Sequence, residues 1–271
     1  MRGTPLVLLV AVCSVSSVCQ TSRIKALQSA AAAGDTRAQF ALGLAHEFGD
    51  GTTSDCAQAA AWYRRAADRG LPEAQNNFGK LLMMGKGVPQ NEAEAMKWFR
   101  RAAAERQPEA ENNIGWMYAF GRGVPRDDEE AVHWYRRAAE HKHALGELNL
   151  ALMYLHGRGV TRDDKVAARL LMQAAESGSG IAESVLASLY ASGRGVGKDL
   201  SKAAHWWERA AQKGIASAEF NFGVLLHRGD GVAKDDVAAR TWLERAAAHG
   251  LTPKYDLDGP DVSMLLEPSS F

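Results

Sequence analysis

An apolar residue followed by a small one recurs along this chain with a fixed period of 36 residues. The small residue stands at Gly43, Gly79, Gly115, Ala151, Ala187 and Gly223. Self-similarity with a period of about 20–50 residues is typical of solenoids, in which each unit buries its apolar face against its neighbours. The pattern therefore predicts six tandem repeats, and it favours a protein with an extended surface over one that encloses a reaction.

The first half of each repeat has the pattern of an amphipathic helix. In the third repeat, Gln107 to Lys142, the apolar residues Ala110, Ile114 and Met117 follow the spacing of one helical face. Gly115 lies inside this helix, where glycine costs about 1 kcal/mol relative to alanine. We interpret it as the place where a second helix approaches closely.

The second half of each repeat predicts another helix. In the third repeat, Gly121 and Gly123 end the first helix, and Pro125 prevents its continuation. Asp127, followed three residues later by Glu130, has the spacing of a capping box. A tryptophan recurs in this helix, and we expect Trp134 to lie between the two helices, where Gly115 makes room. The tryptophans are Trp62, Trp98, Trp134, Trp206 and Trp242, and Leu170 is the exception.

These patterns predict an all-α solenoid of six 36-residue helix–turn–helix repeats over residues 35–250. Residues 20–34 repeat the second-helix pattern without a first helix, so we expect an N-terminal capping helix from Arg23 to Ala33. Pro253 and Pro260 obstruct a seventh repeat. Residues 251–271 are therefore expected to form a tail or a partial cap.

Residues 1–19 have the order of a secretory signal peptide: Arg2, an apolar run from Pro5 to Val12, and small residues up to Cys19. A buried N-terminal helix and a lipoprotein acylated at Cys19 are the alternatives. We expect an exported protein, periplasmic or extracellular, without stable membrane insertion after cleavage. Cys56 would then be the single cysteine, which excludes an internal disulfide.

The net charge and the short motifs give little evidence for nucleic-acid binding, catalysis or metal binding. The 32 basic and 32 acidic side chains cancel, which argues against nucleic acid as a partner. Ser22-x-x-Lys25 matches a fragment of penicillin-interacting sites but has no partner motif, and His141 and His143 have no further metal ligand nearby. We therefore expect no catalytic residue, no metal and no cofactor.

Asparagines recur in the first helices, two residues before the small residue of the repeat. They are Asn77, Asn113, Asn149 and Asn221, and the second and third repeats add Asn76 and Asn112. Lys80 and Trp116 stand one position after the glycine. Side-chain amides can pair with both N–H and C=O groups of an extended peptide.

Two interpretations of this asparagine ladder remain open. In the first, Asn76, Asn77, Lys80, Asn112, Asn113 and Trp116 form a patch that binds a peptide or protein partner. In the second, the asparagines hydrogen-bond to neighbouring backbone groups and set the geometry of the repeats. Trp116 is expected to act in binding under either interpretation.

The string Ala-x-x-x-Leu-Gly-x-x-Tyr-x-x-Gly-x-Gly-Val-x-x-Asp, followed by Ala-x-x-Trp-Tyr-x-x-Ala-Ala-x-x-Gly, resembles the Sel-1-like repeat family, which is related to tetratricopeptide repeats. The match runs from about Ala38 to Gly250. The resemblance implies a right-handed α/α superhelix that serves as an adaptor. We expect a non-catalytic monomer that binds a protein or peptide partner on its concave face. A β-lactam-processing hydrolase and a structural envelope component are the rival functions. The cysteines of the family's disulfide-stapled branch are missing here, so that branch's activity is not carried over.

Overall fold

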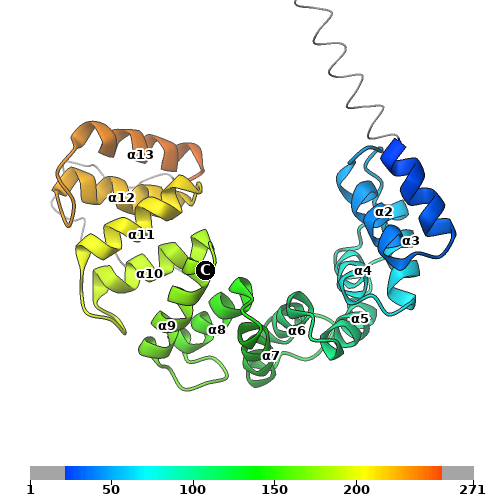
Figure 1. Cartoon of the computed structure of the whole chain (residues 1–271). Helices are drawn as coiled ribbons and strands as arrows, with labels where there is room; N and C mark the ends of the chain where they lie inside the picture. The colour runs from blue at the N-terminus through cyan, green and yellow to red at the C-terminus, as the bar shows by residue number, and fades with distance from the viewer. Residues whose placement is uncertain (1–21, 252–271) are drawn as a thin grey trace, which may run out of the picture. The chain divides into compact units, whose positions relative to one another are not determined.

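The computed structural model of this protein describes residues 22–251, and all regular secondary structure within this range is helical (Figure 1). Residues 22–32 are helical, within the range predicted for the capping helix. The predicted signal peptide, residues 1–19, and nearly all of the predicted tail lie outside the described residues. The helices of the repeats are α2 (Thr36–Phe48), α3 (Cys56–Asp68), α4 (Pro72–Met84), α5 (Glu92–Ala104), α6 (Pro108–Phe120), α7 (Asp128–Glu140), α8 (Ala144–His156), α9 (Asp164–Glu176), α10 (Gly180–Ser192), α11 (Leu200–Gln212), α12 (Ala216–Arg228) and α13 (Asp236–Ala248).

The helix ends follow from the residues that the repeat pattern places there. The first helix of each repeat ends at a glycine in the left-handed conformation, such as Gly121 with φ 65°. Asp127 begins α7 by accepting hydrogen bonds from the backbone N–H groups of Glu129 and Glu130, as the sequence predicted. The chain is therefore an all-α repeat solenoid, with two 13-residue helices in each repeat.

The chain divides into two compact units, residues 1–126 and 127–271. In the first unit α2 packs on α3, α3 on α4, α4 on α5 and α5 on α6. The helical segment 22–32 covers the outer side of α2, where Ile24 and Ala31 form an apolar cluster with Leu42. The apolar side of the first repeat is thereby shielded.

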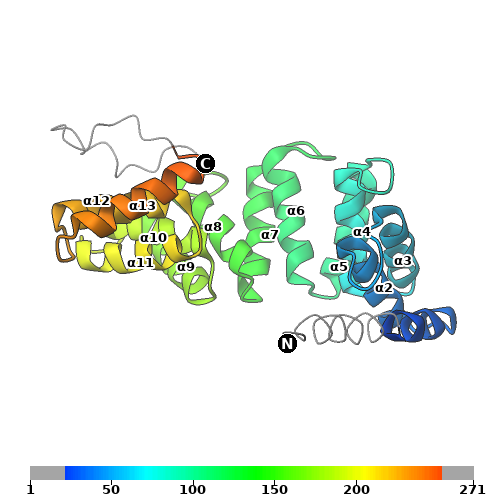
Figure 2. The ribbon, with the colours of Figure 1, turned by 90° about the horizontal axis from the view of Figure 1, so that it is seen from above.

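The second unit contains the helices α7 to α13, each packed on the next. Its core includes Leu171, Leu186 and Trp207, all fully buried. Figures 1 and 2 show α12 and α13 side by side at the end of this unit. There Phe220, Leu243 and Ala246 form a smaller apolar cluster. Within residues 22–251, no helix combines the length and apolar character needed to cross a membrane.

The small residue of the first helix lies where the second helix approaches closely, as the sequence predicted, and an aromatic ring faces it in the first two repeats. A Cβ atom at Gly43 would lie 2.4 Å from the ring of Tyr63, and one at Gly79 would lie 2.7 Å from the ring of Phe99. Tyr63 and Phe99 each follow the recurring tryptophan by one residue. In the first two repeats this space is therefore filled by the residue after the tryptophan, and the expectation for Trp134 beside Gly115 in the third repeat stays a prediction.

The recurring tryptophan contacts the first helix beside this space, as Trp98 does with Phe78, whose ring centre lies 5.4 Å away. Its ring carries the guanidinium group of the arginine three residues later, for example Arg65 at 4.5 Å from the centre of the Trp62 ring and Arg101 at 4.6 Å from that of Trp98. The side chain of Arg137 lies in the same way on Trp134, which is half-buried. The indole thus contacts a cation in addition to its apolar neighbours.

The second loop glycine of a repeat contacts the preceding repeat. Gly195 has a φ of 70°, and a Cβ atom there would lie 2.0 Å from the carbonyl oxygen of Asp164, at the start of α9. The loop backbone therefore lies directly on the first turn of the preceding second helix. The sequence explained this glycine by helix termination alone, whereas close approach between repeats requires it as well.

Candidate partner-binding site

The six predicted site residues lie on α4 and α6, but they are not equally accessible. Asn77, Lys80, Asn113 and Trp116 are half-buried, so part of each side chain faces solvent. Asn76 and Asn112 are 4% and 7% exposed, respectively. The two buried amides cannot contact a peptide in this arrangement, and four of the six residues remain accessible.

The asparagines of the second and third repeats are joined by hydrogen bonds. The Asn113 amide donates to Oδ1 of Asn76 over 2.9 Å, which links α6 to α4. The Asn76 amide in turn donates to Oδ1 of Asn77 over 3.3 Å. Asn76 thus joins neighbouring first helices, which agrees with a role in repeat geometry, although its partners here are side-chain amides and not the backbone groups expected. Part of the hydrogen-bonding capacity of Asn77 and Asn113 is used in the same way.

Trp116 forms part of an aromatic cluster at the end of α6. Its ring lies 5.2 Å from that of Phe120, with the two ring planes at 39°. The guanidinium group of Arg122 lies 6.0 Å from the centre of the indole. Phe120 is 57% exposed. The cluster therefore offers an apolar contact surface beside a cation, which is a common composition for the centre of a protein interface.

Exposed apolar residues extend this surface along the first unit. Phe48, Met84 and Phe120 are 73%, 48% and 57% exposed, and each is the last residue of its first helix. We call these three residues the apolar row. The corresponding residues of the second unit are polar: His156, Ser192 and Arg228. The sequence analysis missed the row, although its 36-residue spacing could have revealed it.

Two lysines lie near the middle of the apolar row. Lys80 stands one helical turn before Met84, and Lys86 follows two residues after it. Neither lysine forms an ion pair with an acidic side chain among the described residues. The accessible surface near Met84 therefore carries positive charge beside apolar groups.

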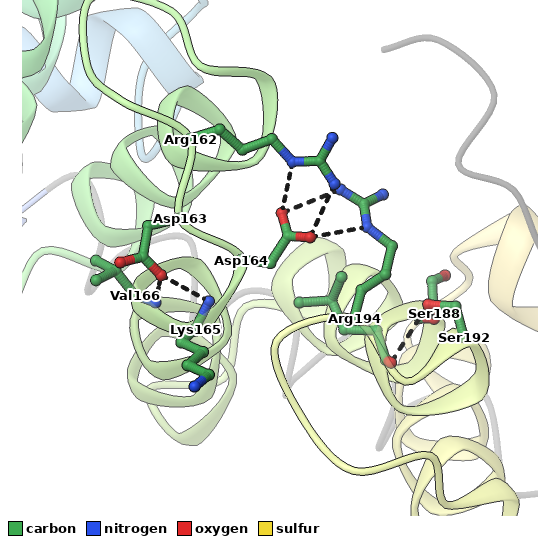
Figure 3. Close-up of polar contacts among 9 residues, drawn as sticks. Arg162, Asp163, Asp164, Lys165, Val166, Ser188, Ser192 and Arg194 are labelled. Carbon is green, nitrogen blue, oxygen red and sulfur yellow. Dashed lines mark hydrogen bonds and ion pairs between the residues drawn. The ribbon is translucent and has the colours of Figure 1, made fainter.

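The most developed polar cluster, in contrast, connects repeats. Figure 3 shows Asp164 between the guanidinium groups of Arg162 and Arg194, with N···O distances of 2.9 and 3.2 Å. Hydrogen bonds from Arg162 and then from Arg194 lower the pKa of the Asp164 carboxyl to about 2. Arg158 and Asp128 form the corresponding pair one repeat earlier, at 2.7 Å. Because the pairs follow the repeat period, we assign them to inter-repeat packing rather than to catalysis.

The residues that the sequence suggested as possible catalytic or metal-binding groups do not form an active site in the described part of the chain. Ser22 and Lys25 are exposed, and Nδ1 of His143 accepts the backbone N–H of Gly146 as a helix cap. Burial raises the pKa of the Tyr63 and Tyr135 hydroxyls, which keeps both neutral. Within residues 22–251, no three His, Cys, Asp or Glu side chains come together in a way that could hold a metal ion.

The comparisons with known proteins identify the repeat. A family model described as Sel1 repeat matches residues 36–71, 72–106, 108–143, 144–179, 181–215 and 216–251. These segments cover most of the chain. No curated protein matches the sequence.

Solved structures give the same result. The structure of c5321, a protective antigen of uropathogenic Escherichia coli strains with an SLR fold, is 34% identical with a TM-score of 0.76. That match covers 84% of this chain but 49% of the antigen, so this chain spans about half of the antigen's length. A Sel1 repeat protein from Oxalobacter formigenes is 32% identical with a TM-score of 0.75, over 83% of this chain and 99% of that one. The immunity protein Pa5087 from Pseudomonas aeruginosa, at 17% identity and a TM-score of 0.54, shares the fold alone.

Proposed function

The chain belongs to the Sel1 repeat family, whose members generally act as protein-interaction scaffolds, and we propose that it is a non-catalytic adaptor that binds a protein or peptide partner on the first helices of its first unit. The binding surface consists of the accessible residues of the predicted patch, Asn77, Lys80, Asn113 and Trp116, extended by the apolar row. The partner needs apolar side chains for the row. An acidic group would match Lys80 and Lys86.

One observation carries this proposal: three large apolar side chains in consecutive repeats are exposed at the same repeat position. Scattered exposed apolar residues are normal on a protein surface, but here they recur at one position of three consecutive repeats, which favours an interaction site. Trp116 extends the set at Phe120, and aromatic residues commonly dominate the binding energy of interfaces. The polar residues at the same positions of the second unit favour the first unit as the binding part.

We further propose that the protein is exported and acts in the periplasm or outside the cell, in envelope signalling, secretion or host interaction. The order of charged, apolar and small residues in positions 1–19 supports export. If the signal peptide is cleaved, the intact mass of protein recovered from the periplasm or medium corresponds to a chain that begins near Gln20. An exported protein that retains Met1 would contradict this proposal.

Substitution of Trp116 tests the binding surface. We expect Trp116→Ala to weaken capture of the native partner more than about tenfold, because about 1.4 kcal/mol of lost binding energy already gives that factor. Asn77→Ala combined with Asn113→Ala acts in the same direction, since each amide hydrogen bond contributes about 0.5–1.5 kcal/mol. The measurement is affinity capture from the native compartment, followed by titration with the purified partner.

Val237→Ala is the matched control, because Val237 is 81% exposed but lies on α13 in the second unit. It should leave binding unchanged, as should substitution of Ser22. Circular dichroism must show that each variant keeps the helicity of the wild type. Normal partner binding by a folded Trp116→Ala protein would rule out this surface.

A further inference from the structure

One buried polar position recurs in every repeat. It lies in the first or second turn of the first helix and is occupied by Gln39, Gln75, Glu111, Glu147, Glu183 and Glu219. Their exposed fractions are 4%, 6%, 0%, 3%, 0% and 0%. A buried amide or carboxylate is costly unless it is hydrogen-bonded or paired with a charge. The groups around this position therefore decide whether a hydrogen-bond donor or a carboxylate is stable there in each repeat.

In the first two repeats the side chain is a hydrogen-bond donor. The Gln39 amide donates to the carbonyl oxygen of Ala31 over 3.1 Å, and the Gln75 amide donates to that of Ala67 over 3.2 Å. Both carbonyls belong to the C-terminal part of the preceding helix. The position therefore joins a first helix to the helix before it through a donated proton.

In the last two repeats the side chain is a carboxylate between two basic groups. Glu183 lies 2.7 Å from Nη2 of Arg209 and 2.9 Å from Nζ of Lys213. Glu219 lies 3.1 Å from Nη2 of Arg245 and 2.7 Å from Nδ1 of His249. The bases come from the C-terminal end of the second helix of the same repeat and the residue that follows it, so charge pairing replaces the donated hydrogen bond.

Glu147 in the fourth repeat has neither arrangement. The positions that correspond to Arg209 and Lys213, one 36-residue period earlier, hold Gln173 and Ser177. Glu147 forms no ion pair or side-chain hydrogen bond with the described residues, and its Oε2 atom is buried without a partner. An ionised carboxylate in this position would lack the compensation that its counterparts have.

The charged groups around Glu147 provide limited help. On the preceding side they are Arg137 and His141 at the end of α7, and Lys142 and His143 in the turn before α8. On the following side α9 ends at Glu176, which is acidic. Burial raises the pKa of the Glu147 carboxyl, and the attraction of Lys142 opposes this effect only in part.

We propose that Glu147 is a proton-binding site at the contact of α7, α8 and α9, and that its protonated carboxyl replaces the glutamine of the first repeats. A protonated carboxyl has an O–H donor, which an ionised one lacks. The corresponding acceptor is the carbonyl oxygen of Ala139, which stands to Glu147 as Ala31 stands to Gln39 and Ala67 to Gln75. Loss of the proton leaves a buried anion near the carbonyl end of α7, and this weakens the packing of the fourth repeat.

The sign of the pH dependence follows from the raised pKa. A carboxyl whose pKa is higher in the folded than in the unfolded chain stabilises the fold most at pH values below the unfolded value of about 4.3. That contribution is lost as the pH rises through the folded pKa. The fourth repeat is therefore a pH-sensitive contact that loosens as the surroundings become less acidic.

Carbon-13 NMR of the side-chain carboxyl groups tests the proposal on the wild-type protein, and Glu147→Gln assigns the signal. We expect the Glu147 carboxyl to titrate at higher pH than exposed glutamates. Glu147→Gln supplies the amide donor permanently and should raise the Tm by about 2–4 °C at pH 8, with a smaller gain at pH 4.5. A Glu147 signal that titrates with the exposed glutamates would overturn the proposal.

Two further variants serve as controls. Glu183→Gln removes a carboxylate from Arg209 and Lys213 and should lower the Tm at pH 8, opposite to Glu147→Gln. Gln173→Arg places a guanidinium where the fifth repeat has Arg209, and it should move the titration of Glu147 to lower pH. If Glu147→Gln and Glu183→Gln lower the Tm equally, or if Gln173→Arg leaves the titration unchanged, the fourth repeat is not different and the proposal fails.

Discussion

At the small-residue position of the first helices, the close approach of the second helix limits the size of the side chain. The ring of Phe99 is fully buried and occupies the space beside Gly79, just as Tyr63 fills the space beside Gly43. In the last repeat Leu243 takes the same place, 2.9 Å from where a Cβ atom of Gly223 would lie. Side chains at these glycines would have to displace a packed ring or a branched side chain.

Gly79→Leu should therefore destabilise the protein by about 2–3 kcal/mol, as overpacking of a filled interior does. Gly197→Leu is the control, because no atom lies within 4 Å of a Cβ atom at Gly197 and the residue is exposed. Its effect should stay within about 0.5 kcal/mol. The free energy of unfolding in urea gives both values, and equal effects of the two substitutions would show that the α4–α5 spacing is wrong.

Neighbouring helices are joined by polar contacts at the loops as well as by apolar packing. The loop arginine of one repeat pairs with the acidic residue that begins the second helix of the previous one, as in Arg158 with Asp128 and Arg194 with Asp164. The position of Asp164 in the first helical turn also suits a negative charge. These pairs occur where the loop glycine already brings the backbones together.

Asp164→Asn should lower the free energy of unfolding by about 1 kcal/mol near pH 6, the upper end for a partly exposed ion pair. Because the pKa of Asp164 is about 2, below the value of about 3.9 in an unfolded chain, the contribution is complete above about pH 4 and is lost toward pH 2. The difference between variant and wild type should shrink over this range in urea titrations.

Asp236→Asn changes the same position of the last repeat, where the side chain is 59% exposed. Within residues 22–251 its ion-pair partners, His227 and Lys234, belong to its own repeat. Its effect should be smaller than that of Asp164→Asn. A larger effect would mean that the contact between repeats is not the source of stability.

At the scale of the whole molecule, each helix packs on the next one along the chain within each of the two units. In such proteins each repeat is stabilised by its own packing and by its immediate neighbours. Damage in one repeat should then remain local, unlike in a globular domain with one central core.

Trp207→Ala tests this locality. Trp207 is fully buried on α11, and loss of such a side chain typically costs about 3–5 kcal/mol. Hydrogen exchange followed by mass spectrometry should show faster exchange in α10, α11 and α12, and unchanged exchange in α2 to α5. Loss of protection throughout the first unit would contradict a solenoid with local contacts.

The repeat period, the helix ends and the fold class could be predicted from the sequence. These features depend on residues close together in the chain: Gly121 ends a helix through its own φ angle, and Asp127 caps the next one two and three residues later. Each signal also appears six times, so that an exception such as Leu170 does not hide the period. Local conformation and repetition were sufficient for this part.

The accessibility of the candidate site could be predicted only in part, because adjacent asparagines on one helix face different neighbours. Asn76 is buried and accepts a hydrogen bond from Asn113 of the next repeat, whereas Asn77 is partly accessible. A helix turns by about 100° per residue, so the side that faces a neighbour depends on where that neighbour packs. The same limit explains why Tyr63 rather than Trp62 faces Gly43.

Local patterns fixed the helices, their caps and their order, because these are set by backbone angles and by hydrogen bonds within a few residues. Contacts between residues about 30 positions apart decided which polar groups are buried and which are satisfied. Glu147 and Glu183 have the same repeat position, yet only Glu183 meets two cations, because α9 and the residue after it hold Gln173 and Ser177 where the fifth repeat has Arg209 and Lys213. Burial and pairing are properties of the packed helices, and no single segment of the chain contains them.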